Sequence, residues 1–281
     1  MSIQDDIDRA PYQAEVESWR DRMEQGLRGD RSWLTLAGLF WLNEGTNRFG
    51  TDPDNEIVLP GESAPAHAGS IVFHAGTATL HAEASAGVAI NGRPATIAQM
   101  RFDADAQDLV TLGDLTMLVI QRGNRHAIRL WDRCSPARMA FTGRRWYPVN
   151  EAYRLSARFV PHDPPHTLAV PNILGETEQR HSPGYAVFAL GGHEHSLDAV
   201  IEGDELFFIF RDQTASDTSY PAGRFLKAAF PQNNQITLDF NRAYSPPCAF
   251  TAFATCPLPP PRNQLPLRIE AGELYDQSHT E

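Results

Sequence analysis

The chain has 281 residues and a formal net charge of −11, which arises from 24 Lys and Arg against 35 Asp and Glu. This length suggests one large domain or two modest ones. An acidic balance disfavours a nucleic-acid partner held by a general basic surface. The three cysteines make neither a disulfide framework nor a four-ligand zinc pattern, so we expect no cofactor and no metal.

The N-terminal stretch MSIQDDIDRA is acidic and polar and lacks the pattern of a secretory signal. The longest apolar run, residues 33–42, is too short to span a bilayer. We therefore expect a cytoplasmic protein with reduced thiols and no membrane association.

Residues 12–27 have the pattern of an amphipathic helix. Val16, Trp19, Met23 and Leu27 recur on one helical stripe, and Gly29 follows as a signal that ends the helix. We expect residues 1–43 to form this helix and a buried connector, with the helix packed across a β-domain.

Short strands alternate with turns rich in Gly, Pro, Asn and Asp between residues 44 and 130. This alternation is typical of an all-β sandwich, which we assign to residues 44–133. The expected strands are 56–59, 70–74, 77–81, 87–90, 109–112, 115–121 and 126–131.

This region resembles a forkhead-associated (FHA) type sandwich. The resemblance is carried by FGTDPDNEIVL from residue 49, by His67, by VAING from residue 88 and by DLVTLG from residue 108. In that family the residue after the first glycine is usually an arginine that binds the phosphate, whereas this sequence has Thr51 at that position. The family's serine precedes its histidine by three residues, whereas Ser63 sits four before His67. The resemblance therefore implies the sandwich without a phosphothreonine site.

Arg129 lies in the segment QRGNRHAIRLWDR, where a strand would place it on the same face as Trp131 and Arg133. An arginine fork suits a carboxylate or a phosphate, so Arg129 is a candidate ligand residue. Structural ion pairs, for instance with Asp132 or Asp212, are the alternative.

Residues 134–281 predict a second antiparallel β-domain, either a barrel or a sandwich, closed by a proline-rich tail. The expected strands are 153–160, 185–190, 196–202, 205–210 and 236–241. Residues 205–210 are apolar on both faces, which is typical of a central strand. His193 and His195 lie at a Gly-rich turn, where exposed histidines are more common than a metal site.

Polar side chains follow two of these strands. We expect them to converge on one pocket under the tail that binds a small polar or anionic ligand. Arg224 and Arg242 would bind a negative group, and Asp212 or Asp239 could act as a general base. The alternative is a set of turns satisfied by their own backbone. The candidate ligand residues here are Asp212, Thr214, Tyr220, Arg224, Asp239, Asn241, Arg242 and Tyr244.

Four motifs together resemble a bacterial family known as domain of unknown function 1684, from about Trp19 to Glu273. They are WLTLAGLFWLNEG, RDQTASDTSYPAGRFL, DFNRAYSPPCAF and CPLPPPRNQLPLRIEAGE. Ser245 stands where asparagine is more usual in this pattern. The resemblance implies membership of the family and brings no established activity.

Three functions remain open from the sequence. The first is a site for a small anionic or polar molecule in the C-terminal β-domain, with or without a hydrolase-type activity. The second is a non-enzymatic module that docks a protein partner on the FHA-like sandwich. The third is a cysteine nucleophile, Cys248, activated by His181 or another histidine. No local sequence pattern supports it, and a buried structural thiol is the favoured alternative. Ligand identity, oligomeric state and the roles of Cys248 and Cys256 stay open.

Overall fold

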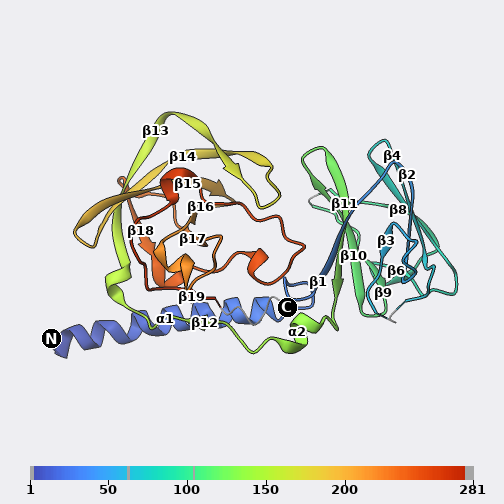
Figure 1. The fold of residues 1–281 in the computed structure, drawn as a ribbon, viewed down its shortest axis with the longest axis horizontal. Helices are drawn as coiled ribbons and strands as arrows, with labels where there is room; N and C mark the ends of the chain where they lie inside the picture. The colour runs from blue at the N-terminus through green and yellow to red at the C-terminus, as the bar shows by residue number, and fades with distance from the viewer. Residues whose placement is uncertain (1–2, 62–63, 104, 276–281) are drawn as a thin grey trace. The chain divides into compact units, whose positions relative to one another are not determined.

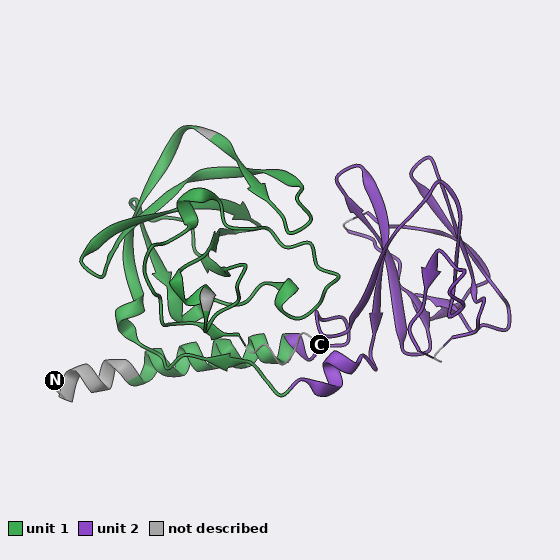
Figure 2. Cartoon of the chain, in the orientation of Figure 1, with its two compact units in different colours: residues 1–26, 142–281 green, residues 27–141 purple. Residues whose placement is uncertain are grey.

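A computed structural model describes residues 3–61, 64–103 and 105–275 (Figure 1). Strands dominate this part of the chain and two α-helices accompany them, which confirms the all-β prediction. The chain divides into two compact units, residues 27–141 and residues 1–26 with 142–281 (Figure 2). We call them the central unit and the outer unit. The predicted domains 44–133 and 134–281 stay predictions.

Two sheets face each other in the central unit. One has the order β1-β11-β10-β9-β6-β7 and the other β3-β2-β4-β5-β8. Their core includes Phe49, Ile71, Leu80, Met117 and Ile128, each fully buried. The strands are β1 (Leu36–Trp41), β2 (Gly45–Gly50), β3 (Ile57–Val58), β4 (Gly69–His74), β5 (Thr77–Ala82), β6 (Ala89–Ile90), β7 (Arg93–Pro94), β8 (Ile97–Met100), β9 (Val110–Leu112), β10 (Leu115–Arg122) and β11 (Arg125–Asp132), followed by α2 (Pro136–Ala140).

A polar turn fixes one end of these sheets. Asn91 has a φ of +50°, a left-handed conformation that asparagine tolerates better than most residues. Its side chain donates to Asp108 Oδ1 over 2.8 Å and accepts from the Leu109 amide over 3.0 Å. Hydrogen bonds from Arg101 hold the pKa of Asp108 down at about 2, so this carboxylate stays charged and anchors the turn.

The outer unit is built on one antiparallel sheet of six strands in the order β17-β16-β15-β14-β13-β18 (Figure 1). Its strands are β13 (Arg154–Pro171), β14 (Thr177–Leu190), β15 (His193–Glu202), β16 (Glu205–Phe210), β17 (Arg224–Ala228) and β18 (Gln235–Asp239). The short pair β12 (Arg145–Trp146) and β19 (Glu273–Leu274) completes it.

β16 is an interior strand of this sheet, as its sequence predicts. Leu206, Phe208 and Phe210 point into the main core of the unit. Phe207 and Ile209 point to the opposite face, where they pack with Ala254 and Cys256 of the proline-rich tail. The tail therefore covers the second face of the sheet, which explains why this strand is apolar on both sides.

β13 is longer than the predicted strand 153–160 and continues without a break to Pro171. Its pairing with β14 shifts register between Pro161 and His166, which accommodates the prolines as an irregularity. β18 pairs with β13 over Arg154–Arg158 alone. The prolines of β13 lie beyond that point. Because β13 does not pair with β18 there, the missing amide hydrogens of the prolines break no hydrogen bonds to β18.

The helix prediction was right in its end and wrong in its start. α1 (Ile3–Leu27) begins nine residues earlier than predicted and contains Pro11. Ile3, Ile7 and Ala10 fall at helical spacing, but Pro11 follows them, and a proline usually marks a helix boundary. The predicted strand 236–241 also ends early. Asp239 accepts a hydrogen bond from the Asn241 amide and starts the 3₁₀ turn Phe240–Arg242 instead.

In the part of the chain described above, no helix is both long enough and apolar enough to cross a membrane.

Candidate functional site

The structure brings six of the nine predicted ligand residues together in two clusters of three. Arg129 lies on β11 of the central unit, and the other eight belong to the outer unit. Asp212, Thr214 and Arg224 form one cluster, which we call the tail anchor. Asp239, Asn241 and Arg242 form a second, which we call the helix anchor. Arg224 pairs with Asp212, and Arg242 pairs with Asp239, so these residues partner one another within each cluster. Their convergence on one ligand pocket stays a prediction.

The tail anchor is a buried ion pair. The side chains of Arg224 and Asp212 are 0% and 1% exposed, and Arg224 Nη2 lies 3.0 Å from Asp212 Oδ1. Arg224 also donates to the carbonyl of Ala271 and, over 3.0 Å, to that of Ile269. The Ile269 amide donates to Asp212 Oδ2 over 2.7 Å. The pair thus fixes the C-terminal tail to the end of β16.

Thr214 completes this cluster. Its hydroxyl lies 2.9 Å from each carboxylate oxygen of Asp212 and 2.8 Å from the hydroxyl of Ser219. Both oxygens of Asp212 therefore accept hydrogen bonds from inside the protein. A carboxylate held in this way is a structural element, since a general base needs an oxygen that faces the substrate.

The helix anchor attaches α1 to the sheet. The Tyr12 hydroxyl donates to Asp239 Oδ1 over 2.7 Å and accepts from Asn241 Nδ2 over 2.9 Å. Arg242 bonds to Glu15 of the same helix and lies 3.2 Å from Asp239. α1 runs along this side of the unit in Figure 1. These polar groups hold α1 and the end of β18 together.

The two predicted tyrosines are tied to the tail and to β17. The Tyr220 hydroxyl donates to the Cys248 carbonyl over 3.0 Å. Tyr244 pairs with Phe225 through two backbone hydrogen bonds of 2.8 and 2.9 Å. Burial raises the pKa of both phenols, so both stay neutral.

Arg129 stands apart on the central unit. Its guanidinium carbon lies 5.8 Å from the ring centres of both Trp33 and Trp131. Burial lowers the pKa of this arginine, and within the described ranges no carboxylate pairs with it. Neither predicted ion-pair partner is used, because Asp132 accepts the Cys134 amide and Asp212 pairs with Arg224.

Sequence reasoning missed a second buried ion pair of the outer unit. Arg144 Nη1 lies 2.6 Å from Glu273 Oε2, and their side chains are 4% and 3% exposed. The Ser245 amide donates to the same oxygen over 2.7 Å. This contact uses the backbone amide of Ser245 and does not depend on its side chain. No local signal could reveal a pair whose members lie 129 positions apart.

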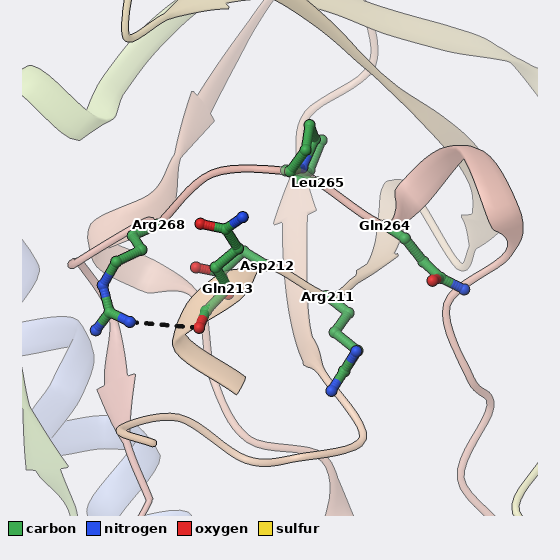
Figure 3. A pocket seen from close by; sticks show the side chains of 7 residues that line it. Arg211, Asp212, Gln213, Gln264, Leu265 and Arg268 are labelled. Atoms are coloured by element: carbon green, nitrogen blue, oxygen red, sulfur yellow. Dashed lines mark hydrogen bonds between the residues drawn. The ribbon is translucent and has the colours of Figure 1, made fainter. Parts of the chain in front are cut away.

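An open hollow of about 460 Å³ lies where the tail crosses the end of β16 (Figure 3). We call it the tail hollow. Its floor is backbone, because residue 211 exchanges hydrogen bonds with residues 263 and 265, and the Gln213 amide donates to Leu267. Its lining residues are Arg211, Asp212, Gln213, Gln264, Leu265, Pro266 and Arg268. Of the predicted ligand residues, Asp212 alone belongs to this lining.

The two arginines of the tail hollow differ in whether a carboxylate neutralises their charge. Arg268 bonds to Asp217 through both terminal nitrogens and to Glu270 through Nε. Arg211 donates through Nε to the Pro221 carbonyl over 2.9 Å. In the described ranges no carboxylate pairs with Arg211, so it supplies the uncompensated positive charge of this hollow.

Comparison with known proteins identifies the family. The sequence profile of DUF1684, described as a protein of unknown function, matches residues 139–274. The chain belongs to the DUF1684 family. The match is shorter than the predicted span from Trp19 to Glu273, and the motif WLTLAGLFWLNEG lies outside it. The tail anchor and the tail hollow lie entirely inside the segment that defines DUF1684.

Solved structures similar to this DUF1684 protein include an uncharacterised protein of Haloarcula marismortui, 32% identical, which covers 50% of this chain and 81% of its own, with a TM-score of 0.43. The FHA domain of FhaA is 20% identical over 33% of this chain and 96% of its own, with a TM-score of 0.25. An FHA-2 domain from a Mycobacterium tuberculosis ABC transporter is 27% identical over 31% and 77%, with a TM-score of 0.24. No curated protein matches this sequence.

The central unit of the DUF1684 chain has a second hollow, of about 290 Å³, on its outer sheet face. Arg48, Ser70 and His81 are neighbours across β2, β4 and β5 and line it together with His67. His67 Nδ1 lies 3.3 Å from Asn55 Oδ1, and Arg48 is held by Glu56 at 2.9 Å. Ser63 lies outside the described residues.

The three cysteines of the DUF1684 chain are thiols, with Cys134 exposed, Cys248 half-buried and Cys256 buried. Within residues 3–61, 64–103 and 105–275 no three His, Cys, Asp or Glu side chains are grouped closely enough to hold a metal ion. His193 and His195 belong to β15, and the ring of His195 lies 3.2 Å from the Leu190 carbonyl.

Proposed function

We propose that this DUF1684 protein binds a small anionic or polar molecule in the tail hollow. The observation that carries the proposal is the guanidinium of Arg211, which lines a cavity of about 460 Å³ without a carboxylate partner in the described chain. The side-chain amides of Gln213 and Gln264 line the same space. A guanidinium beside amides suits a carboxylate or a phosphate, which accept several hydrogen bonds at once.

The tail anchor supports the proposal because it makes the floor of the hollow rigid. Asp212 and Arg224 lock residues 269 and 271, and the backbone bonds of residues 211 and 213 lock residues 263–267. A site on a fixed frame loses little conformational entropy when a ligand binds.

Binding rather than hydrolysis is the activity proposed. Among the seven lining residues Asp212 is the one carboxylate, and both of its oxygens accept hydrogen bonds from Arg224, Thr214 and Ile269. A hydrolase would need a nucleophile or base directed at the ligand. The proposal agrees with the cytoplasmic location expected from the sequence.

The test is thermal stabilisation and calorimetric titration of the full chain with inorganic phosphate and citrate. We expect Arg211→Ala to weaken binding about 10- to 100-fold, the loss of one charge-assisted contact of about 1.5–3 kcal/mol. Arg180→Ala is the matched control, since Arg180 is another surface arginine of the outer unit and pairs with Glu178. Equal stabilisation of the Arg211 variant and the control would contradict the proposal, as would a wild-type protein that responds to neither anion.

The second candidate function is docking of a protein partner on the central unit. The observation that favours it is the hollow of about 290 Å³ on the β2–β4–β5 face, where Arg48 and His81 are exposed. We expect His81→Glu to reduce recovery of a stoichiometric partner in a pull-down with the full chain, because it places a negative charge where an acidic partner would contact the imidazole. His74→Glu, an exposed change at the end of β4, is the control. Equal recovery by both variants would argue against this face.

A further inference from the structure

The proline-rich tail brings two thiols together. Cys248 lies in the 3₁₀ turn Pro247–Ala249, and its backbone amide donates to Cys256 Sγ over 3.0 Å. A side-chain hydrogen bond from the other thiol is the largest cause of the pKa shift of each cysteine. A disulfide requires Cα atoms about 4.4–6.8 Å apart and side chains directed at each other. A thiol that already contacts both the amide and the thiol of its partner meets the second requirement.

The protein frame holds both cysteines in place. The Cys256 carbonyl accepts the Ile173 amide over 3.1 Å, and the Leu258 amide donates to Pro171 over 2.7 Å, so this end of the tail is pinned to the end of β13. The Cys248 carbonyl accepts the Tyr220 hydroxyl. Because both backbones are fixed, the contact between the thiols is a built feature of the tail.

The surroundings give the two thiols different tasks. Cys256 is 3% exposed and packs in an apolar cluster with Phe207 and Phe225. Cys248 is half-buried and so is more exposed than Cys256. The hydrogen bond from Cys256 lowers the pKa of Cys248, and the same bond raises that of Cys256. Cys248 thus has the greater thiolate character, which determines which thiol attacks.

Cys134 provides an internal comparison. It is exposed, and a hydrogen bond to the Asp114 carboxylate raises its pKa. Exposure and thiolate character therefore point to different cysteines in this chain. Exposure alone would make Cys134 the reactive thiol, whereas the paired geometry would make Cys248 the reactive thiol.

We propose that Cys248 and Cys256 form a redox-active dithiol that undergoes exchange with small disulfides. The Cys248 thiolate attacks one sulfur of the disulfide, forms a mixed disulfide and expels the first thiolate. Cys256 then gives up its proton and attacks Cys248 Sγ, which closes the Cys248–Cys256 bond and releases the second thiol. The protein loses two electrons and two protons, and one small disulfide is reduced to two thiols.

The test is equilibration of the folded full chain with cystamine and cysteamine, followed by acid quenching and mass spectrometry. We use Cys134→Ser as the parent protein, so that the exposed thiol cannot react. The expected product is two hydrogens lighter and carries a Cys248–Cys256 link in peptide maps. Excess cysteamine should return it to the dithiol.

Two variants identify the roles. In the same parent, Cys256→Ser should stop at one cysteamine adduct on Cys248, and Cys248→Ser should form neither adduct nor link at an equal time. The parent protein decides the proposal even if a variant fails to fold. The proposal is overturned if the folded parent keeps two thiols at equilibrium, or if it collects adducts without an internal bond.

Discussion

Replacing Arg224 with methionine is expected to lower the free energy of unfolding of the outer unit by about 3–5 kcal/mol. The change leaves the Asp212 carboxylate, whose side chain is 1% exposed, without its cation. It also removes two donors from the carbonyls of Ile269 and Ala271, which anchor the tail. The loss is large because removing one partner leaves a buried charge unpaired. Replacing both partners of a buried ion pair by apolar residues would change the stability much less.

Urea denaturation followed by circular dichroism measures this loss, and hydrogen-exchange mass spectrometry assigns it to residues 205–228 and 263–271. A second change, Asp212→Asn in the Arg224→Met background, should recover part of the stability, since it removes the unpaired charge. Arg180→Ala, at an exposed ion pair, should cost at most about 1 kcal/mol. Equal, small losses at Arg224 and Arg180 would show that the tail anchor is not a structural pair.

Replacing Arg144 with methionine is expected to cost about 3–5 kcal/mol at pH 8 and less at pH 5. Burial already raises the pKa of Glu273, and Arg144 opposes that rise. Without the arginine the folded-state pKa rises further above the unfolded value. The folded protein then binds a proton that the unfolded chain releases. Stability is therefore retained at low pH and lost as the pH rises toward the folded-state pKa.

The companion variant Glu273→Gln separates this mechanism from simple loss of packing. It leaves Arg144, with a side chain 4% exposed, as the unpaired charge. Arginine keeps its charge at every pH of interest and Gln does not titrate, so the stability of Glu273→Gln should change less between pH 5 and 8 than that of the Arg144 variant. Urea midpoints across that range, each compared with wild type, give the two slopes. A pH-independent loss in the Arg144 variant would disprove the assigned role of Glu273.

Local sequence patterns predicted the elements of this protein well. The β16 strand, residues 205–210, was placed correctly because its apolar run and flanking turns act over a few residues. The same holds for the short strands of the central unit, such as β5 and β10, where turn residues mark both ends. The start of α1 was missed because Pro11, which usually marks a helix boundary, lies inside this helix.

The sequence by itself determined the strand content, the interior strand of the outer unit and the family, because these depend on residue types in short, ordered segments. The tertiary structure alone decided the partners of the polar groups. Arg224 met Asp212 and the tail carbonyls, and Asp239 met Tyr12 across 227 positions. Such pairings follow from how the sheet and the tail fold onto each other, and charge or hydrogen-bonding capacity alone does not specify a partner. Arg211, which lines the tail hollow, was not predicted as a ligand residue for the same reason. It stands out because no carboxylate pairs with it among the described residues, and the sequence does not show which charges pair.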